Sequence, residues 1–235
     1  MARVVDRFDI EIVVAPVFAT NCCVVRYGDD AVVVDPGAGV AREVMALFDR
    51  TPGLACHGVL ATHWHPDHTW DAAELCESLQ APLYINEADA PYLADPLGAL
   101  RAQSAESAQV VNMIAASAAG LGFGDYRAPT RVSPFTTTPS LQLGTIELGL
   151  IHAPGHTEGS TLYLTPDAVL TGDVLFRDGV GRTDLPGGNQ AVMEATLHSL
   201  ASVLDPALKM IPGHGPSSTI SRELASNPYL RMALS

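Results

Sequence analysis

Basic side chains are scarce in this sequence of 235 residues, which has a single lysine, Lys209, and a formal net charge of −13. Nucleic-acid phosphates require a basic surface, so this deficit argues against nucleic acid as a partner. The sequence has no apolar run of about 18 residues, the length that spans a bilayer. Residues 1–7 also lack the apolar stretch of a secretory signal. We therefore expect a cytoplasmic protein without a membrane span.

Cysteine is also scarce, and its spacing shows no CxxC motif. The four cysteines are Cys22, Cys23, Cys56 and Cys76, and no two are in CxxC spacing. If Cys22 and Cys23 lie in one strand, their side chains point to opposite faces. We expect a reducing compartment, with the cysteines acting as small apolar residues and not as a disulfide framework.

Apolar residues make up 47% of the chain, and their pattern predicts an α/β protein. Strands are predicted at Ile10–Val14, Cys22–Tyr27, Ala31–Asp35, Gly58–Thr62, Leu83–Asn86, Ile146–Ile151, Thr161–Leu164, Ala168–Leu170 and Leu208–Ile211. Helices are predicted at Val40–Arg50, from Asp67 or Thr69 to Gln80, at Leu97–Ala119, at Ala191–Leu204 and near the C-terminus. Each half runs from strands to helices. This order predicts two sheets sandwiched by helices in one domain, residues 1–235.

The segment 95–138 differs in texture from the rest. It is rich in alanine and serine and contains a glycine-rich loop at Gly120–Asp125. It lies between the two halves of the chain, so it is a candidate lid or specificity insertion. A helix pair that only covers a sheet is the alternative.

A dense group of metal-ligand side chains lies in the stretch Thr62–His68. His63 and His65 are two residues apart and would point the same way in an extended segment. Asp67 and His68 follow at the next bend and can face a second position. Four metal-binding side chains this close together predict a metal site, and further ligands must come from elsewhere in the chain.

Three further residues can supply those ligands, each after a predicted strand and next to glycine. They are His156 in Ala153–Ser160, Asp173 after Gly172, and His214 between glycines. Glycine lets the backbone turn sharply and approach an ion. Imidazole and carboxylate suit zinc, iron and manganese. The remaining histidines are interpreted as ordinary core or surface residues: His57, His152 and His198.

The pattern His63-x-His65-x-Asp67-His68, followed by the three residues above, resembles the metallo-β-lactamase superfamily over nearly the whole chain. The resemblance implies an α/β fold, the αββα four-layer sandwich, with metals at one edge between the sheets. It implies that His63, His65 and His156 bind a first metal, that Asp67, His68 and His214 bind a second, and that Asp173 bridges them. It also gives Asp35 a role in supporting the ligand loops; a simple turn residue before Pro36-Gly37 is the alternative.

Such a site predicts two divalent metal ions, zinc in the first place, with iron or manganese as alternatives. Two ions about 3.5–4 Å apart can bridge a water and lower its pKa toward ~7, which gives hydroxide at neutral pH. Asp67 is the candidate catalytic residue, since it can orient the hydroxide and handle a proton. Esters, thioesters, lactones, β-lactams and some phosphodiesters are all substrates for this chemistry, so the site alone does not choose.

The segment Gly172–Asp184 looks like the glyoxalase II (hydroxyacylglutathione hydrolase) group and like persulfide dioxygenases. Arg182 is then a candidate for binding a substrate carboxylate, with a loop-bracing ion pair to Asp184 as the alternative. Longer glyoxalase II enzymes bind glutathione with a basic C-terminal region. Here the only basic residues in 216–235 are Arg222 and Arg231, so the sequence does not predict which thiol carries the acyl group.

The leading hypothesis is a dinuclear hydrolase that cleaves a small-molecule thioester. A mononuclear iron persulfide dioxygenase using His63, His156 and Asp173 is the main alternative. A lactonase or other esterase and a non-catalytic metal-binding protein are the others. The oligomeric state is not predicted; adjacent apolar stripes in the sequence would serve a homodimer, but they would serve the core equally well.

Overall fold

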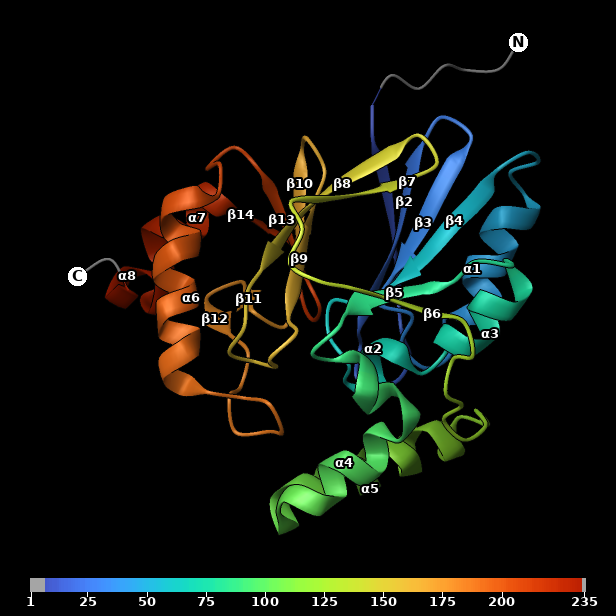
Figure 1. Ribbon diagram of the computed structural model, residues 1–235, viewed down its shortest axis with the longest axis horizontal. Helices are drawn as coiled ribbons and strands as arrows, with labels where there is room; N and C mark the ends of the chain where they lie inside the picture. The colour runs from blue at the N-terminus through green and yellow to red at the C-terminus, as the bar shows by residue number, and fades with distance from the viewer. Residues whose placement is uncertain (1–6, 234–235) are drawn as a thin grey trace.

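The computed structural model describes residues 7–233 and shows two six-stranded sheets packed face to face between helices (Figure 1). The first sheet has the order β1-β2-β3-β4-β5-β6. Its strands are β1 (Asp9–Val14), β2 (Asn21–Tyr27), β3 (Asp30–Val34), β4 (Ala55–Leu60), β5 (Leu83–Asn86) and β6 (Val132–Phe135). The predicted strands Cys22–Tyr27 and Ala31–Asp35 correspond to β2 and β3, which pair in antiparallel fashion as a hairpin around Gly28.

The second sheet is built from the other half of the chain, in the order β14-β13-β10-β9-β8-β7. Its strands are β7 (Ser140–Leu143), β8 (Ile146–His152), β9 (Thr161–Leu164), β10 (Ala168–Gly172), β13 (Lys209–Pro212) and β14 (Ser218–Thr219). A separate small hairpin joins β11 (Leu175–Phe176) to β12 (Gly179–Val180).

Helices cover the outer face of each sheet. On the first sheet these are α1 (Ala41–Asp49) and α3 (Ala72–Ser78), and on the second α6 (Gln190–Val203), α7 (Ile220–Ser226) and α8 (Pro228–Ala233). The predicted αββα four-layer sandwich is therefore confirmed. No helix among residues 7–233 is both long and apolar enough to span a bilayer.

Alternating side chains build two different cores from one strand. In β2, Cys22 and Val24 face the helices, whereas Cys23 and Val25 face the second sheet. This confirms that the two adjacent cysteines point to opposite faces. A strand buried on both sides reads as a continuous apolar run, which is why periodicity located β2 and β3 without showing which face was which.

Several elements differ from those that the sequence predicts. The helix predicted from Asp67 or Thr69 to Gln80 is two helices, α2 (Pro66–Thr69) and α3, and neither of those residues is an N-cap. The C-terminal helix is α7 and α8, because Pro228 interrupts the backbone ladder. The pattern also missed the strands β6, β7, β11, β12 and β14. The last three have two residues each, too few to show a period. The strand β6 contains Pro134, which argues against a strand.

The segment 95–138 forms a helical pair that projects from the body near α2 and η1 (Ala90–Ala94), before β6 returns to the first sheet (Figure 1). Its predicted single helix is broken at Ser104 into α4 (Pro96–Gln103) and α5 (Ala105–Gly120). Ser104 is extended, and its side chain accepts a hydrogen bond from the backbone N–H of Ser107 as an N-cap.

Candidate metal centre

All seven residues predicted as metal ligands lie together at one end of the sandwich. The stretch that follows β4 supplies four of them, and the others come from the β8–β9 loop and from the ends of β10 and β13. In each sheet, parallel neighbours end at the same edge, so segments far apart in the sequence meet there. They are His63, His65, Asp67, His68, His156, Asp173 and His214.

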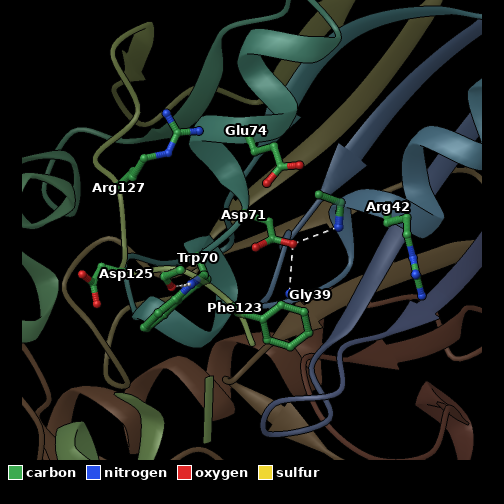
Figure 2. Close-up of a pocket in the computed structure, with 10 residues that line it drawn as sticks. Gly39, Arg42, Trp70, Asp71, Glu74, Phe123, Asp125 and Arg127 are labelled. Atoms are coloured by element: carbon green, nitrogen blue, oxygen red, sulfur yellow. Dashed lines mark hydrogen bonds between the residues drawn. The ribbon is translucent and has the colours of Figure 1, made fainter. Parts of the chain in front are cut away.

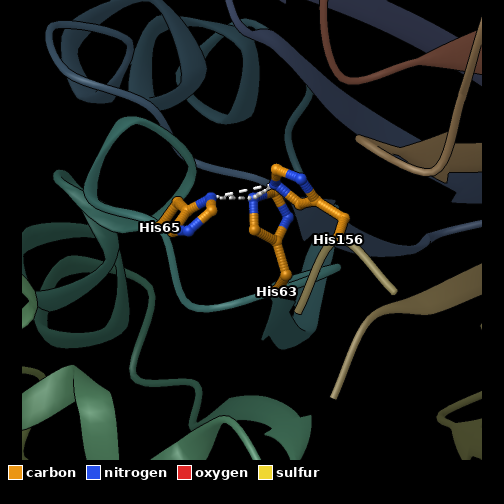
Figure 3. Close-up of side chains that lie close together, drawn as sticks. All are labelled: His63, His65 and His156. Atoms are coloured by element: carbon orange, nitrogen blue, oxygen red, sulfur yellow. Dashed lines mark hydrogen bonds between the residues drawn. The ribbon is translucent and has the colours of Figure 1, made fainter. Parts of the chain in front are cut away.

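Three buried histidines form the first cluster: His63, His65 and His156 (Figure 3). His63 Nε2 lies 3.0 Å from His65 Nδ1 and 3.2 Å from His156 Nε2, and His156 Nε2 lies 2.9 Å from His65 Nδ1. Three ring nitrogens converge on one point from two loops. A neutral imidazole has one lone pair to offer, and this convergence is what a metal ion requires.

The second cluster consists of Asp67, His68 and His214. His214 Nε2 lies 3.2 Å from Asp67 Oδ2 and 3.1 Å from His68 Nε2. Asp173 lies between the clusters: its Oδ2 is 3.7 Å from His156 Nε2 and 3.5 Å from His214 Nε2. One carboxylate oxygen thus faces a histidine of each cluster, as a bridging ligand would.

Backbone carbonyls fix the orientation of two of the histidines. His156 Nδ1 lies 2.7 Å from the carbonyl oxygen of Arg182, and His214 Nδ1 lies 2.9 Å from that of Phe18. A carbonyl only accepts, so each Nδ1 carries the proton and each Nε2 presents its lone pair to the centre. Such outer contacts keep metal-binding imidazoles in the required tautomer.

Asp35 supports both clusters. Its Oδ1 accepts from the Thr62 backbone N–H at 2.7 Å, and its Oδ2 lies 2.8 Å from Thr62 Oγ1 and 3.0 Å from His68 Nδ1. Thr62 Oγ1 donates to this carboxylate and can accept from His63 Nδ1, 3.0 Å away. Asp35 also sits at a turn, with φ of 56°. It is therefore both the turn residue and the hydrogen-bond partner that the sequence left as alternatives.

Replacing Asp35 with asparagine should weaken metal binding by about 10–100-fold, the usual effect of losing such a partner. Asparagine tolerates a positive φ, so the backbone turn should persist. The NH₂ group of asparagine, however, would face a donor on Thr62 or His68, and that hydrogen bond would be lost. Chelator competition measures the affinity. Asp30→Asn, which changes a carboxylate at the opposite end of β3, is the matched control. Equal metal affinity in both variants would contradict the role.

The electrostatics favour cation binding. Burial lowers the pKa of His63, His65 and His156, so these imidazoles are neutral and ready to bind. Burial also opposes charge on His68, but the nearby carboxylates, Asp173 first, outweigh it and raise the pKa of that imidazole. For Asp173, burial alone would raise the pKa, yet the surrounding histidines lower it to about 2. The centre therefore holds ionised carboxylates that call for positive charge.

The position of one buried oxygen supports the same conclusion. Asp173 Oδ1 lies 3.3 Å from His68 Nε2 and makes no hydrogen bond of standard geometry among the described residues, although such oxygens are normally satisfied. A Cβ on Gly213 would lie 2.2 Å from this oxygen and 2.6 Å from His68 Cε1, so glycine keeps the space open. Converging nitrogens, ionised carboxylates and a carboxylate oxygen without a full hydrogen bond fit a divalent metal ion, and these residues could hold one.

Among the described residues, the side chains of the centre are more exposed at the second cluster than at the first. The histidines of the two clusters, apart from His214, are at most 4% exposed. The side chains of His214, Asp67 and Asp173 are 25%, 15% and 12% exposed. Solvent, and any substrate, therefore reaches the centre from the side of the second cluster.

Arg182 contributes its backbone to the centre, and its side chain lies elsewhere. The guanidinium forms two hydrogen bonds to Asp184, Nε to Oδ1 and Nη2 to Oδ2, both 2.7 Å. The ion pair is the alternative interpretation of this arginine, and it is present. Binding of a substrate carboxylate by Arg182 stays a prediction. The histidines set aside from the sequence lie outside the metal-binding clusters: His57, His152 and His198.

Sequence reasoning missed several residues that support the centre. The Phe18 carbonyl, Thr62 and Asp89 all lie outside the ligand motifs. Thr62 borders the histidine stretch, and this position is a signal that could have indicated its role. Phe18 acts through its backbone, and Asp89 is far from the motifs in sequence, so neither leaves a pattern.

A cavity of about 390 Å³ lies beside the residues that follow His68 (Figure 2). Trp70 and Phe123 contribute aromatic rings to its lining, and Asp71 lies near its middle. Asp71 Oδ2 accepts from the backbone N–H of Gly39 at 2.9 Å and of Ala41 at 2.8 Å, which satisfies the start of α1. Charged side chains surround it: Arg42, Glu74, Asp125 and Arg127.

The sequence profile of the Metallo-beta-lactamase superfamily matches residues 15–214, which include every residue of both clusters. The chain belongs to this superfamily. The αββα fold described above agrees with this assignment.

Curated relatives align along almost their whole lengths. An uncharacterized protein of Mycobacterium tuberculosis, Rv2581c, is 35% identical over 92% of this chain and 95% of its own. The probable metallo-hydrolase YqgX of Bacillus subtilis is 31% identical, over 86% and 88%. Hydroxyacylglutathione hydrolase GloC of Haemophilus influenzae is 29% identical, over 94% and 98%.

Solved structures show the same fold. The BLEG-1 B3 metallo-beta-lactamase superposes with a TM-score of 0.77 at 28% identity, covering 94% of this chain and 99% of that one. TTHA1623 in a di-iron-bound form superposes with a TM-score of 0.72 at 30% identity, covering 93% and 99%. Similar scaffolds therefore occur both in a β-lactamase and in a protein that binds two iron ions.

Proposed function

We propose that this protein is a dinuclear metal-dependent hydrolase that cleaves a small-molecule thioester. The observation that carries the proposal is the convergence of two ligand clusters on the single carboxylate of Asp173. His63, His65 and His156 would hold one ion, and Asp67, His68 and His214 the other. Two ions bound there would lower the pKa of a shared water toward ~7 and supply hydroxide.

The protein side chains shield the centre from solvent and orient the nucleophile. The buried histidines close the inner side to solvent, so the electrostatic interactions in the centre are little screened. Asp67 lies on the open side, where its carboxylate can orient the nucleophile and accept a proton. Burial would raise the pKa of Asp67, but the neighbouring His68 and His214 lower it, so the carboxylate is ionised.

The thioester assignment rests on chemistry and on similarity. A hydroxide site of this kind serves several classes of acyl substrate. The resemblance of Gly172–Asp184 to the glyoxalase II group favours thioesters, and the GloC relative, itself a hydroxyacylglutathione hydrolase by name, supports this choice. Zinc is our expected metal. Iron is the main alternative, because the similar protein TTHA1623 has been solved in a di-iron-bound form.

We propose that the segment 95–138 shapes substrate access. Its apolar side chains Ile114 and Phe123 pack in one cluster with Val17, in the loop before β2, and with Trp70, which follows the second-cluster ligands. Trp70 Nε1 also donates to the carbonyl of Gly124 at 3.2 Å. The segment 95–138 therefore contacts both the loop before β2 and the stretch after His68, which lie beside the more exposed side of the centre. A helix pair that only covered a sheet would not need those contacts.

A mononuclear iron persulfide dioxygenase is the second candidate, because His63, His156 and Asp173 do lie together. The complete second cluster argues against it, since that activity needs no second ion. A lactonase or esterase would use the same nucleophile and differ only in the substrate.

Metal-replete protein is expected to contain about two metal equivalents per chain and to hydrolyse at least one acyl-thiol. Elemental analysis gives the first quantity. A panel of acyl-glutathione, acyl-coenzyme A and acyl-cysteine thioesters, with lactones and β-lactams as comparators, gives the second. About one equivalent of iron together with oxygen uptake on a thiol persulfide would favour the dioxygenase. Two equivalents without thioester cleavage would remove the thioester assignment.

A further inference from the structure

Asp89 is a fully buried carboxylate at the junction of the two loops that supply the first cluster. It follows β5 and precedes η1, so it belongs to neither loop. Its exposure is 0%, and a carboxylate is rarely buried to this extent without a specific set of partners.

The partners of Asp89 come from both loops. Its Oδ2 accepts from the backbone N–H of Trp64, the residue between His63 and His65, at 3.1 Å. The same oxygen accepts from Thr157 Oγ1 at 2.7 Å, and Oδ1 accepts from the Gly159 N–H at 2.7 Å. Thr157 directly follows His156. One side chain therefore ties the backbone that presents two first-cluster histidines to the backbone that presents the third.

Two further contacts fit the same arrangement. A Cβ on Gly159 would lie 2.5 Å from Asp89 Cγ, so glycine is required for the loop to approach the carboxylate. Tyr92, three residues after Asp89, stacks on Trp64 with ring centroids 4.5 Å apart. The turn that begins at Asp89 thus holds the histidine stretch by its backbone and by the ring of Trp64.

We propose that Asp89 is a positioning residue that sets the distance between the two loops and so the geometry of the first metal site. The inference rests on the proposed metal ligands and adds a residue outside the ligand motifs. It needs no contact between Asp89 and the metal. A carboxylate can accept all three donors at once, whereas an amide of the same shape would turn its NH₂ toward one of them.

The test is stepwise Zn²⁺ and Co²⁺ titration of metal-free Asp89→Asn against wild type. We expect the dissociation constant of the first site to rise about 10–100-fold, with little change at the second site. A His65→Ala variant, which removes a first-cluster ligand, identifies the step that belongs to this site. The absorption spectrum of bound Co²⁺ should change in the same step. Gly159→Ala, which strains the contact from the opposite loop, should show the same selective weakening.

Controls separate positioning from general stability. Asp30 also accepts three hydrogen bonds, from Thr145 N, Thr145 Oγ1 and His57 Nε2, but far from the loops. Asp30→Asn should lower the melting temperature without selective loss at the first site. Thr157→Ser keeps the hydroxyl and should bind like wild type, whereas Thr157→Val should weaken the first site.

Two results would overturn the inference. Either unchanged metal binding in Asp89→Asn or equal weakening of both sites would show that Asp89 is only a core residue. If the wild-type protein binds no metal, the proposed function is contradicted. This result differs from the two results above, which concern only the Asp89→Asn variant.

Discussion

We expect Asp67→Asn to keep a metal in the first cluster. Its turnover rate should fall about 10²–10⁴-fold below wild type, the range for removal of a general acid or base. The substitution preserves shape but removes the charge and the ability to take a proton. Asp67 Oδ2 lies 3.2 Å from His214 Nε2, so the second site should also weaken. Asp67 is not a member of the first cluster, so that cluster should still bind its metal ion.

Turnover under metal-saturating conditions and metal content per chain should be measured on the same preparation. Asp167→Asn, an exposed aspartate without a described side-chain partner in the centre, is the matched control and should resemble wild type. Retained turnover in Asp67→Asn would remove this residue from the catalytic role. Loss of both metals would show that it acts only by holding the site together.

Gly213→Ala should lower activity by about 10²-fold or more and cost roughly one metal equivalent. The new Cβ would be 2.2 Å from Asp173 Oδ1 and 2.6 Å from His68 Cε1. Ordinary contact requires these atoms to move by about 1 Å, and a displacement of that size in a reacting centre can cost 10²-fold. Gly213 precedes His214 and follows β13, so the strand end cannot easily move instead.

Gly179→Ala is the control for the added methyl group. Gly179 lies in β12, and its nearest neighbour to a new Cβ is Phe176 Cβ at 3.9 Å, an ordinary contact. That variant should keep its metal and its activity. If Gly213→Ala also kept both, the distances between Asp173 and His68 would not be critical to the centre. Thermal unfolding of both variants shows whether either change acts through the fold.

Much of the fold could be predicted from the pattern of apolar residues. This pattern predicts the strands from β1 to β5, from β8 to β10, and β13, because buried strands carry continuous apolar runs between turn residues. Helix breaks were missed at Ser104 and near Trp70. There the choice depends on hydrogen bonds by side chains or on packing against distant segments, which periodicity does not record.

The sequence by itself determined the family and predicted which residues bind metal, since histidine and aspartate at motif spacing identify both. Only the tertiary structure decided how those ligands are held. Asp35 reaches His68, Asp89 joins two loops, and the Phe18 carbonyl orients His214. The physical reason is that each of these contacts joins residues remote in the chain. Several use backbone groups that every residue has, so no residue type marks them in advance.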